Sequence, residues 1–399
     1  MAKLFIEDLP DLKGKRVVVR VDYNVPLNGG KVEDDRRIQA SLPTVRYLQS
    51  SGARVVLMSH LGRPKGVIKD ALRLAPVAAR LGELLGKPIA SATDCVGPDA
   101  AAKVAALKDG EVVLLENVRF HPEEEKNQAD FAKELAHGAD YFVNDAFGTA
   151  HRAHASTEGL TRFVKKSACG YIIRDELKYL GEVLANPARP YVAISGGAKI
   201  SGKIDLIESV LPTVDHLLIG GGMTYTFLKA LGYEIGNSLL EADKITLAKK
   251  TIDNAAGKLE LPVDSVVSTE FDFGERKVGS LSTVPVDQIP ADSIGLDIGQ
   301  ATIDHFRKII LEAKTIVWNG PMGVFEIDAT AVGTFAIAEA LAEATRNGAT
   351  TIVGGGDSAA AVEKAGLADQ ISHVSTGGGA TLEYLQGLEL PGVAALTDA

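Results

Sequence analysis

The sequence predicts an α/β protein of two domains, each built on a mostly parallel sheet. Its 399 residues exceed the usual length of one domain. Short apolar runs alternate with longer amphipathic stretches, and repeated strand–helix units of this kind form parallel sheets with right-handed crossovers. The chain also has 41 glycines and only 6% aromatic residues, which suits many tight turns between strands and helices.

The predicted strands are short runs rich in Val, Ile and Leu that do not alternate with polar residues, a pattern typical of strands buried on both faces. They cover residues 16–21, 54–58, 112–115, 141–143, 192–194, 216–219, 265–267, 315–317 and 350–353. Amphipathic helices are expected between them, at residues 71–85, 129–137, 204–211, 242–256, 303–313 and 334–345. From Leu390 onward we expect a loop or tail and no further strand.

A domain boundary is predicted in the middle of the chain. The pattern of residues 173–185 indicates one helix, which ends at a segment that holds Pro187 and Pro190. A new apolar strand follows at once. We therefore expect a first domain at residues 1–172, an interdomain helix at 173–187 and a second domain from residue 188.

Composition excludes several classes of protein. The net charge of −10 argues against general nucleic-acid binding. No run approaches the ~20 apolar residues that span a bilayer, and the acidic N-terminal residues are unlike a signal peptide. The only cysteines, Cys95 and Cys169, fit a reducing compartment. We expect a cytoplasmic protein with no membrane or nucleic-acid partner.

The charge is unevenly distributed along the chain. Residues 1–172 carry 25 Lys and Arg against 22 Asp and Glu, whereas residues 173–399 carry 17 against 30. This difference is either chance or a sign that the first half receives a small anion.

Glycine-rich segments in the second half are candidates for phosphate binding, because glycines let backbone N–H groups approach an anion at a helix start. Gly197 to Lys203 fits the spacing G-x-x-x-x-G-K, but Ile204 stands where a nucleoside-triphosphatase loop has Ser or Thr. This leaves a phosphate loop of another kind or a plain glycine-rich turn. Three further glycine runs lie at residues 220–222, 354–356 and 377–379. Three of the four runs follow predicted strands, where ligands of open α/β sheets bind.

Asp357 directly follows one of these glycine runs. It is either the cap of the next helix or a ligand of a phosphate-bound Mg²⁺.

Arginines and histidines in the first half lie where predicted strands end. The segments are Arg20–Asn24, Ser59–Pro64, Glu116–Phe120 and Ala150–His154, with Arg36 and Arg37 at a helix start. Arginine binds carboxylate and phosphate with paired hydrogen bonds. These residues are either separate surface arginines or one site for a small, doubly anionic substrate. The spacing His151-x-x-His154 lacks a third ligand, so zinc is not expected there, and Trp318 is expected to be packed in the core.

Seven motifs in the chain together resemble phosphoglycerate kinase. They are VDYNVP (21–26), LMSHLGRP (57–64), GGAK (196–199), WNGP (318–321), GVFE (323–326), GGGDS (354–358) and HVSTGGG (373–379). The motifs occur in order, and the resemblance extends from about residue 9 to residue 392. Tyr23 stands where Phe is usual and Ser358 where Thr is common, and neither change affects the expected activity.

The resemblance implies two Rossmann-like domains that face each other across a cleft, joined by the interdomain helix. It also implies that the C-terminal segment, residues 377–399, returns to the first domain, so that the second domain ends at 376. The implied activity is reversible phosphoryl transfer from 1,3-bisphosphoglycerate to ADP, in glycolysis and gluconeogenesis, with Mg²⁺, hinge closure and a monomeric protein.

By motif position, the resemblance assigns residues to three roles. The first domain binds 3-phosphoglycerate or 1,3-bisphosphoglycerate through Asp22, Tyr23, Asn24, Arg37, His60, Leu61, Gly62, Arg63, Arg119 and Arg152. The second binds MgADP or MgATP through Gly197, Ala198, Lys203, Gly221, Gly222, Gly295, Glu326, Gly355, Gly356, Asp357 and Ser358, with Asp357 nearest the metal. Arg37, Lys199 and Gly378 are the candidates for stabilising the transferring group.

Two other functions fit the sequence less well. A nucleotide-dependent dehydrogenase needs G-x-G-x-x-G after the first strand, where this chain has Asp22-Tyr23-Asn24. A two-lobed anion-binding protein without catalysis would not need the nucleotide-type glycine runs or the pair Lys199 and Lys203.

Overall fold

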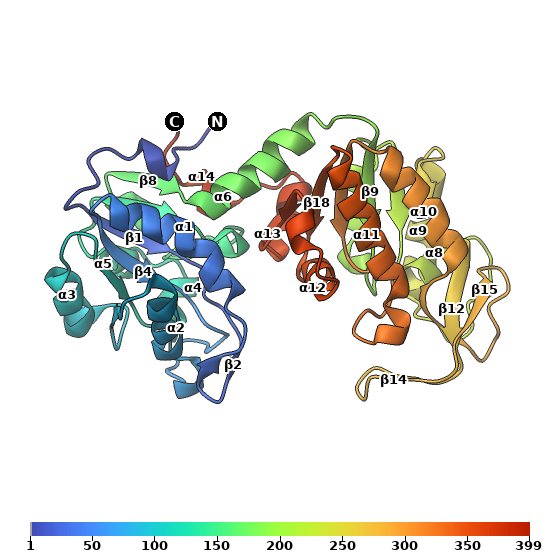
Figure 1. The fold of residues 1–399 in the computed structure, drawn as a ribbon, viewed down its shortest axis with the longest axis horizontal. Coiled ribbons are helices and arrows are strands. Elements are labelled where there is room, and N and C mark those ends of the chain that lie inside the picture. The colour runs from blue at the N-terminus through green and yellow to red at the C-terminus, as the bar shows by residue number, and fades with distance from the viewer. Residues whose placement is uncertain (1) are drawn as a thin grey trace. The chain divides into compact units, whose positions relative to one another are not determined.

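The computed structural model describes residues 2–399, the side chain of Glu182 aside, and the chain forms two compact units. Unit 1 holds residues 2–178 and 389–399, and unit 2 holds residues 179–388. Each is built on a six-stranded parallel sheet with helices beside it (Figure 1). The predicted α/β class with two mostly parallel sheets is confirmed.

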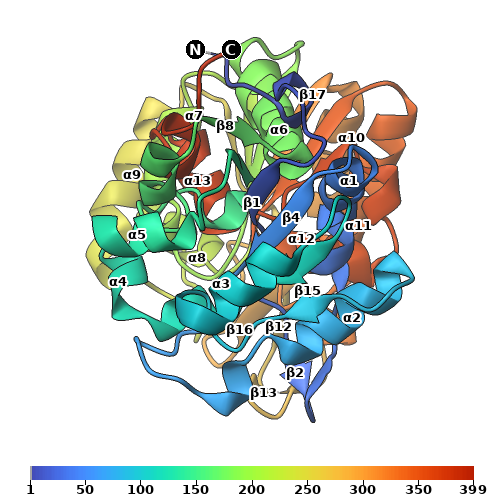
Figure 2. The same ribbon diagram turned by 90° about the vertical axis from the view of Figure 1, so that its left-hand side faces the viewer.

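The sheet of unit 1 has all its strands parallel. In spatial order they are β5 (Ala90–Ser91), β6 (Val112–Leu114), β4 (Arg54–Met58), β1 (Arg16–Arg20), β7 (Tyr141–Asn144) and β8 (Lys166–Cys169). The helices are α1 (Arg36–Ser50), α2 (Ala75–Leu85), α3 (Gly97–Ala106), α4 (Pro122–Glu125), α5 (Ala129–Leu135), α6 (Tyr171–Glu176) and α14 (Pro391–Ala394). A small hairpin joins β2 (Leu27–Asn28) to β3 (Lys31–Val32). Figure 2 shows β1 and β4 in the middle of this unit.

Unit 2 has the same plan with one addition. Its parallel strands are, in spatial order, β11 (Leu259–Glu260), β10 (His216–Ile219), β9 (Tyr191–Ser195), β17 (Thr315–Asn319), β18 (Thr350–Gly354) and β19 (His373–Val374). Its helices are α7 (Ile204–Val210), α8 (Thr224–Ala230), α9 (Ile245–Asn254), α10 (Gln300–Glu312), α11 (Val332–Arg346), α12 (Gly356–Lys364) and α13 (Gly379–Leu385). The addition is antiparallel: β15 (Ser282–Pro285), β12 (Asp264–Ser268) and β16 (Ile294–Ile298) form one sheet, and β13 (Phe271–Asp272) pairs with β14 (Lys277–Val278).

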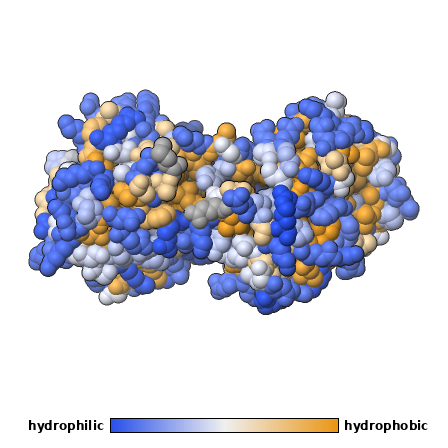
Figure 3. All heavy atoms as spheres, turned by 90° about the horizontal axis from the view of Figure 1, so that it is seen from above, coloured by the Kyte–Doolittle hydropathy of each residue, from blue (hydrophilic) through white to orange (hydrophobic). Residues whose placement is uncertain are grey.

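Apolar burial explains why these runs become strands. Val17, Val18 and Val19 of β1 are fully buried, as expected for a strand covered on both faces. In unit 2, Trp318 of β17 is fully buried in the main core, as predicted. On the face drawn in Figure 3, hydrophilic residues predominate and apolar residues are scattered among them, which is ordinary for a folded surface.

Three local predictions differ from the structure. The run 265–267 lies in β12 of the antiparallel sheet, because local polarity does not tell which neighbours a strand will pair with. The helix expected from residue 71 starts at Ala75, and Asp70–Leu72 form a separate 3-10 turn. The helix expected at 173–185 starts earlier, at Tyr171, and ends at residue 185 as expected, but Leu177–Val183 within it have π-helical hydrogen bonding.

The C-terminal residues belong to unit 1. The short helix α14 lies within residues expected to be a loop or tail, and its Gly392 carbonyl accepts a hydrogen bond from Asn144 Nδ2 at 2.9 Å. Lys3 Nζ pairs with Asp398 at 2.7 Å. Residues 377–388 lie in unit 2, where α13 packs on α7. The domain boundaries expected from sequence stay predictions.

No helix among the residues the structure describes is long and apolar enough to cross a membrane.

We predict that replacing Phe306 by Ala lowers the free energy of unfolding of unit 2 by about 3–5 kcal/mol, the usual cost of emptying a buried aromatic position. Phe306 on α10 is fully buried, and the control Phe273→Ala removes a ring that is 58% exposed. Urea unfolding followed by the emission of Trp318, the single tryptophan, reports on unit 2 alone. Equal losses in the two variants would contradict this account of the core.

Candidate active site

The first candidate half-site lies at one edge of the unit 1 sheet. Strands β6, β4, β1 and β7 are neighbours and run parallel, so their carboxyl ends meet at the same edge. The residues that follow these four strands carry the motifs singled out in the first half of the sequence. The structure therefore brings together segments that lie more than one hundred residues apart in the chain.

Arg37 is held by groups that follow β1. Its Nη1 lies 3.0 Å from Asp22 Oδ2 and donates a second hydrogen bond to the Asn24 carbonyl at 3.3 Å. The arginine lies in the first turn of α1, a turn that holds no acidic residue. A positive charge there opposes the helix dipole, which favours anions at a helix start. Because this position is unfavourable for a positive charge, we expect Arg37 to bind an anion there.

His60, which follows β4, is buried against a second arginine. Arg20 Nη2 lies 3.1 Å from His60 Nδ1. A guanidinium can only donate, so Nδ1 accepts this bond and Nε2 carries the proton of the neutral ring. The pKa of His60 lies well below its ordinary value because of burial and of the positive charges that surround it. These charges belong to Arg20, Arg119, Arg37 and Arg152.

We call Arg20, Arg37, Arg119, Arg152 and His60 the arginine cluster. Arg119 Nη1 donates to the Gly62 carbonyl at 3.1 Å, and Asn24 Oδ1 accepts the Gly62 N–H at 2.8 Å. Burial and the nearby charges of Arg20 and Arg152 lower the pKa of Arg119 to about 10, so it stays positive at neutral pH.

The other predicted substrate residues are less uniform in position. Arg63 is exposed, and Leu61 is buried with its N–H donated to Asn117 Oδ1 at 3.2 Å. The Tyr23 side chain is fully buried, and its hydroxyl lies 2.8 Å from Ser41 Oγ. Only its backbone is therefore close to the sheet edge.

Arg20 was not assigned a role from the sequence. It is fully buried, and its Nε donates to Ser156 Oγ at 2.9 Å. The Ser156 hydroxyl in turn donates to the buried Glu124 carboxylate at 2.5 Å. Its position at the end of an apolar strand was the one sign of a special role in the sequence. The residues that contact Arg20 come from distant segments, so the sequence could not identify them.

The second candidate half-site lies at the corresponding edge of the unit 2 sheet. Strands β10, β9, β17, β18 and β19 are parallel neighbours, and the loops that follow them hold the glycine runs. We call residues 195–198, 220–222, 319–321 and 354–356 the glycine edge. Two of its glycines show why side chains are excluded. A Cβ on Gly221, which has φ +71°, would lie 2.5 Å from the Gly197 nitrogen, and one on Gly320, with φ +99°, would lie 2.2 Å from the Gly196 oxygen.

Lys203 supplies positive charge to this edge. Its Nζ donates to the side-chain oxygen of Asn319, the last residue of β17. Burial lowers the pKa of Lys203 to about 8, although the negative charge of Asp357 acts in the opposite direction. A half-buried ammonium with a single side-chain partner is suited to receive an anion.

The last two residues of the GGGDS motif have different surroundings. Asp357 is exposed in the first turn of α12, and Ser358 is fully buried, with its Oγ accepting the Gly320 N–H at 2.5 Å. Gly355, at φ +91°, caps this helix and lies against the Asn319 amide. Asp357 is therefore open to solvent, whereas the Ser358 hydroxyl joins the start of α12 to the loop after β17.

The remaining predicted residues of unit 2 spread over a wider region. Gly197, Gly222 and Glu326 are half-buried, and Ala198, Lys199 and Gly356 are exposed. Gly378 precedes α13 with φ +52°. Gly295 lies in the antiparallel strand β16, where a Cβ would meet the Tyr225 hydroxyl at 1.8 Å. Asn319, which contacts Lys203, belongs to the WNGP motif, but no feature of the sequence assigned it to the nucleotide site.

Comparisons with known proteins identify the family of this chain. A family model described as phosphoglycerate kinase matches residues 6–388. The chain belongs to the phosphoglycerate kinase family. It is 56% identical to the phosphoglycerate kinase of Prosthecochloris aestuarii over the full length of both chains. It is also 56% identical to that of Synechococcus elongatus, with 98% of this chain and 97% of that protein covered.

Solved structures agree with this membership. The phosphoglycerate kinase from Coxiella burnetii has a TM-score of 0.88 against this chain, at 41% identity and 98% coverage of both chains. The enzyme from Pyrococcus horikoshii gives 0.86 at 34% identity, also with 98% coverage. The chain is thus an enzyme with phosphoglycerate kinase activity, a transferase of glycolysis, as the motifs predicted.

We predict that His154 stays neutral far below the ordinary pKa of histidine. Burial and the charges of Arg119, Arg20 and Arg152 lower its pKa to about 4. Between about pH 6.5 and pH 4 the unfolded state therefore binds a proton that the native state does not, so unit 1 loses stability as the pH falls through this range.

An NMR titration of the histidine ring signals tests this, with the His154 signal assigned by its loss in His154→Gln. We expect its midpoint near pH 4 and a flatter loss of stability in the variant. The exposed His305 of unit 2 serves as the control for substitution. A midpoint near 6.5 for His154 would contradict the prediction.

Proposed function

We propose that unit 1 binds 3-phosphoglycerate or 1,3-bisphosphoglycerate at the arginine cluster and that unit 2 binds MgADP or MgATP at the glycine edge. The observation that carries this proposal is the difference between the two edges. The unit 1 edge offers charged side chains, and the unit 2 edge offers backbone N–H groups and the half-buried Lys203. A small, highly charged substrate suits the first, and the polyphosphate of a nucleotide suits the second.

The arginine cluster matches a substrate with a phosphate and a carboxylate or acyl phosphate. Arginines bind both groups with paired hydrogen bonds and remain charged. His60 adds a neutral donor, since its Nδ1 is occupied by Arg20 and its proton lies on Nε2. We assign Asp22 and Asn24 to positioning, because they hold Arg37 and the Gly62 backbone.

The glycine edge matches the phosphates of a nucleotide. Its glycines allow a close approach to backbone nitrogens, and α12 begins there. Lys203 would neutralise phosphate charge, and a bound anion would restore the full charge of the lysine by raising its pKa.

Asp357 is the residue we assign to Mg²⁺. Carboxylate oxygens are preferred ligands of this ion, and Asp357 is exposed close enough to Lys203 to affect its pKa. The residues present therefore fit a Mg²⁺-bound nucleotide. The ion would shield the charges of the nucleotide phosphates.

Phosphoryl transfer between these ligands needs no general base. The bond from phosphorus to the acyl oxygen breaks and a bond to a terminal oxygen of ADP forms. No proton is transferred, because the attacking ADP oxygen is already anionic and the acyl oxygen leaves as a carboxylate. The protein has to position two repelling anions and stabilise the charge of the transferring group. We assign this role to Arg37 and Lys199, with the backbone of Gly378 as an additional donor. Hinge closure around residues 173–187 stays a prediction.

We further propose that the protein is a cytoplasmic monomer. Both cysteines, Cys95 and Cys169, are free and buried, which agrees with a reducing compartment.

We predict that Arg37→Ala lowers kcat by about 10³-fold or more in a coupled assay of ATP-dependent phosphorylation of 3-phosphoglycerate, the loss typical of a charge-stabilising arginine in phosphoryl transfer. The control is Arg36→Ala, one residue earlier, where the guanidinium pairs with Asp34 and the side chain is 56% exposed. We expect this control to keep kcat within a few fold. A small loss in Arg37→Ala, or equal losses in both variants, would overturn the role of Arg37.

We predict that MgADP raises the melting temperature of the wild type and that Lys203→Met abolishes this rise, because only native-state binding stabilises a protein. Saturation at 100 times Kd corresponds to about 2.7 kcal/mol. Asp357→Asn should keep stabilisation by metal-free ADP and lose the additional effect of Mg²⁺. The control Lys308→Met changes an exposed lysine on α10. Retained MgADP stabilisation in Lys203→Met would place the nucleotide elsewhere.

A further inference from the structure

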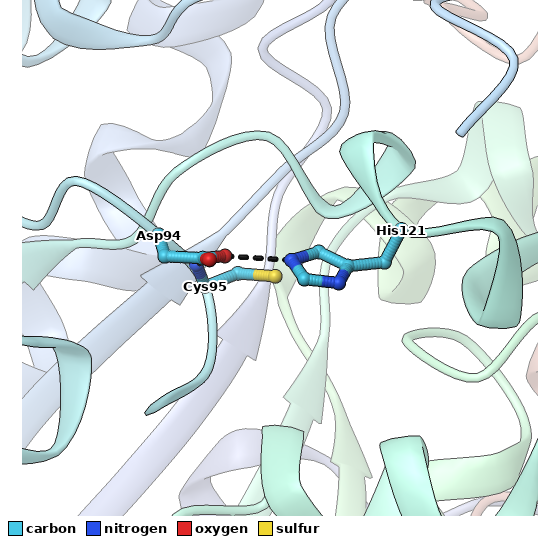
Figure 4. Close-up of side chains that lie close together, drawn as sticks. All are labelled: Asp94, Cys95 and His121. Carbon is cyan, nitrogen blue, oxygen red and sulfur yellow. Dashed lines mark hydrogen bonds and ion pairs between the residues drawn. The ribbon is translucent and has the colours of Figure 1, made fainter. Parts of the chain in front are cut away.

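Three side chains with metal-binding atoms meet in unit 1 outside the arginine cluster. Asp94 and Cys95 lie in the turn before α3, and His121 lies between the 3-10 turn Val118–Phe120 and α4. One ligand atom from each lies within 4.8 Å of the other two. His121 Nε2 is 2.7 Å from Asp94 Oδ1, and the Cys95 sulfur points toward the same place (Figure 4). Among residues 2–399 it is the one such group of three.

We propose that Asp94, Cys95 and His121 form a binding site for a zinc-type divalent ion. Sulfur, imidazole nitrogen and carboxylate oxygen are the donors that Zn²⁺ uses, and three protein ligands leave a fourth tetrahedral position for water. The side chains of Asp94 and His121 are 44% and 27% exposed, which opens the site to solvent on one side. Cys95 is fully buried and forms the side of the site that faces the protein interior.

The ligands are held in place by contacts that need no ion. The Cys95 carbonyl accepts a hydrogen bond from His137 Nε2 at 2.9 Å. The His121 ring lies 5.1 Å from the Phe131 ring, centroid to centroid. An ion would therefore replace the present His121–Asp94 hydrogen bond without rearranging the backbone segments that carry the ligands.

The local charge favours a cation. The carboxylates of Asp94 and Glu124 place negative charge near the Cys95 sulfur. The same negative charges attract a divalent ion. One thiolate, one carboxylate and one neutral imidazole balance the two positive charges of the ion.

Binding has a defined proton balance. The S–H bond of Cys95 breaks, a sulfur–metal bond forms and the proton leaves to solvent. His121 Nε2 exchanges its proton for the ion, and the neutral ring carries its proton on Nδ1 instead. One proton is released per ion, so the affinity should rise about tenfold per pH unit while the pH stays below the pKa of the thiol.

The test is titration of the full chain, stripped of metal and without nucleotide, with Co²⁺ in place of Zn²⁺. We expect one ion per chain and the sulfur-to-cobalt charge-transfer band that only a bound thiolate produces. Cys95→Ser should abolish the band. The matched control is Cys169→Ser, which removes the other buried cysteine and should keep the band unchanged.

His121→Gln provides a second route if Cys95→Ser fails to fold, because the His121 side chain is partly exposed. We expect it to weaken Co²⁺ binding by about tenfold or more and to remove the rise in melting temperature that Zn²⁺ gives the wild type. Absence of the band in the wild type would overturn the proposal. Its persistence in Cys95→Ser or its loss in Cys169→Ser would do the same.

Discussion

The parallel register of the two six-stranded sheets determines where each half-site can form. In a parallel sheet every strand ends at the same edge, so residues that follow β6, β4, β1 and β7 collect there although helices separate them in sequence. The same geometry gathers the glycine loops that follow β10, β9, β17 and β18. The helices supply the long return path that parallel strands require, and their first turns add backbone donors at the same edge.

The unit 1 half-site requires a positive charge to be buried, which is energetically unfavourable. Arg20 is fully buried, and a buried guanidinium is stable only where its donors are satisfied. Ser156 and His60 accept its hydrogen bonds, and Glu124 supplies the opposing charge. This arrangement holds His60 neutral and orients its ring. Because Arg20 occupies Nδ1, the hydrogen bond that His60 can donate to a ligand comes from Nε2.

In the function we propose, the two half-sites bind anions by different means, and the charge distribution agrees with this difference. Unit 1 uses side-chain charge, in the half of the chain with a slight positive balance. Unit 2 is strongly acidic overall. Its candidate anion-binding groups are backbone N–H groups, which carry no net charge and so do not appear in the composition. Lys203 and a Mg²⁺ ion held by Asp357 would provide the remaining charge. The proposed nucleotide site is therefore compatible with an acidic half, because backbone N–H groups of the glycine edge would contact the phosphates directly.

The amino-acid sequence by itself determined the fold class, most strands of the two parallel sheets and the family, because buried parallel strands are continuous apolar runs and the motifs occur in a specific order. It also identified the segments that reach both edges. Only the tertiary structure decided that β12 joins an antiparallel sheet, that Gly295 makes room for Tyr225, that the Tyr23 side chain faces the core, and that Arg20 supports His60. It alone placed His121 beside Asp94 and Cys95. These features depend on contacts between residues far apart in the chain, and such contacts leave no periodic pattern in the local sequence.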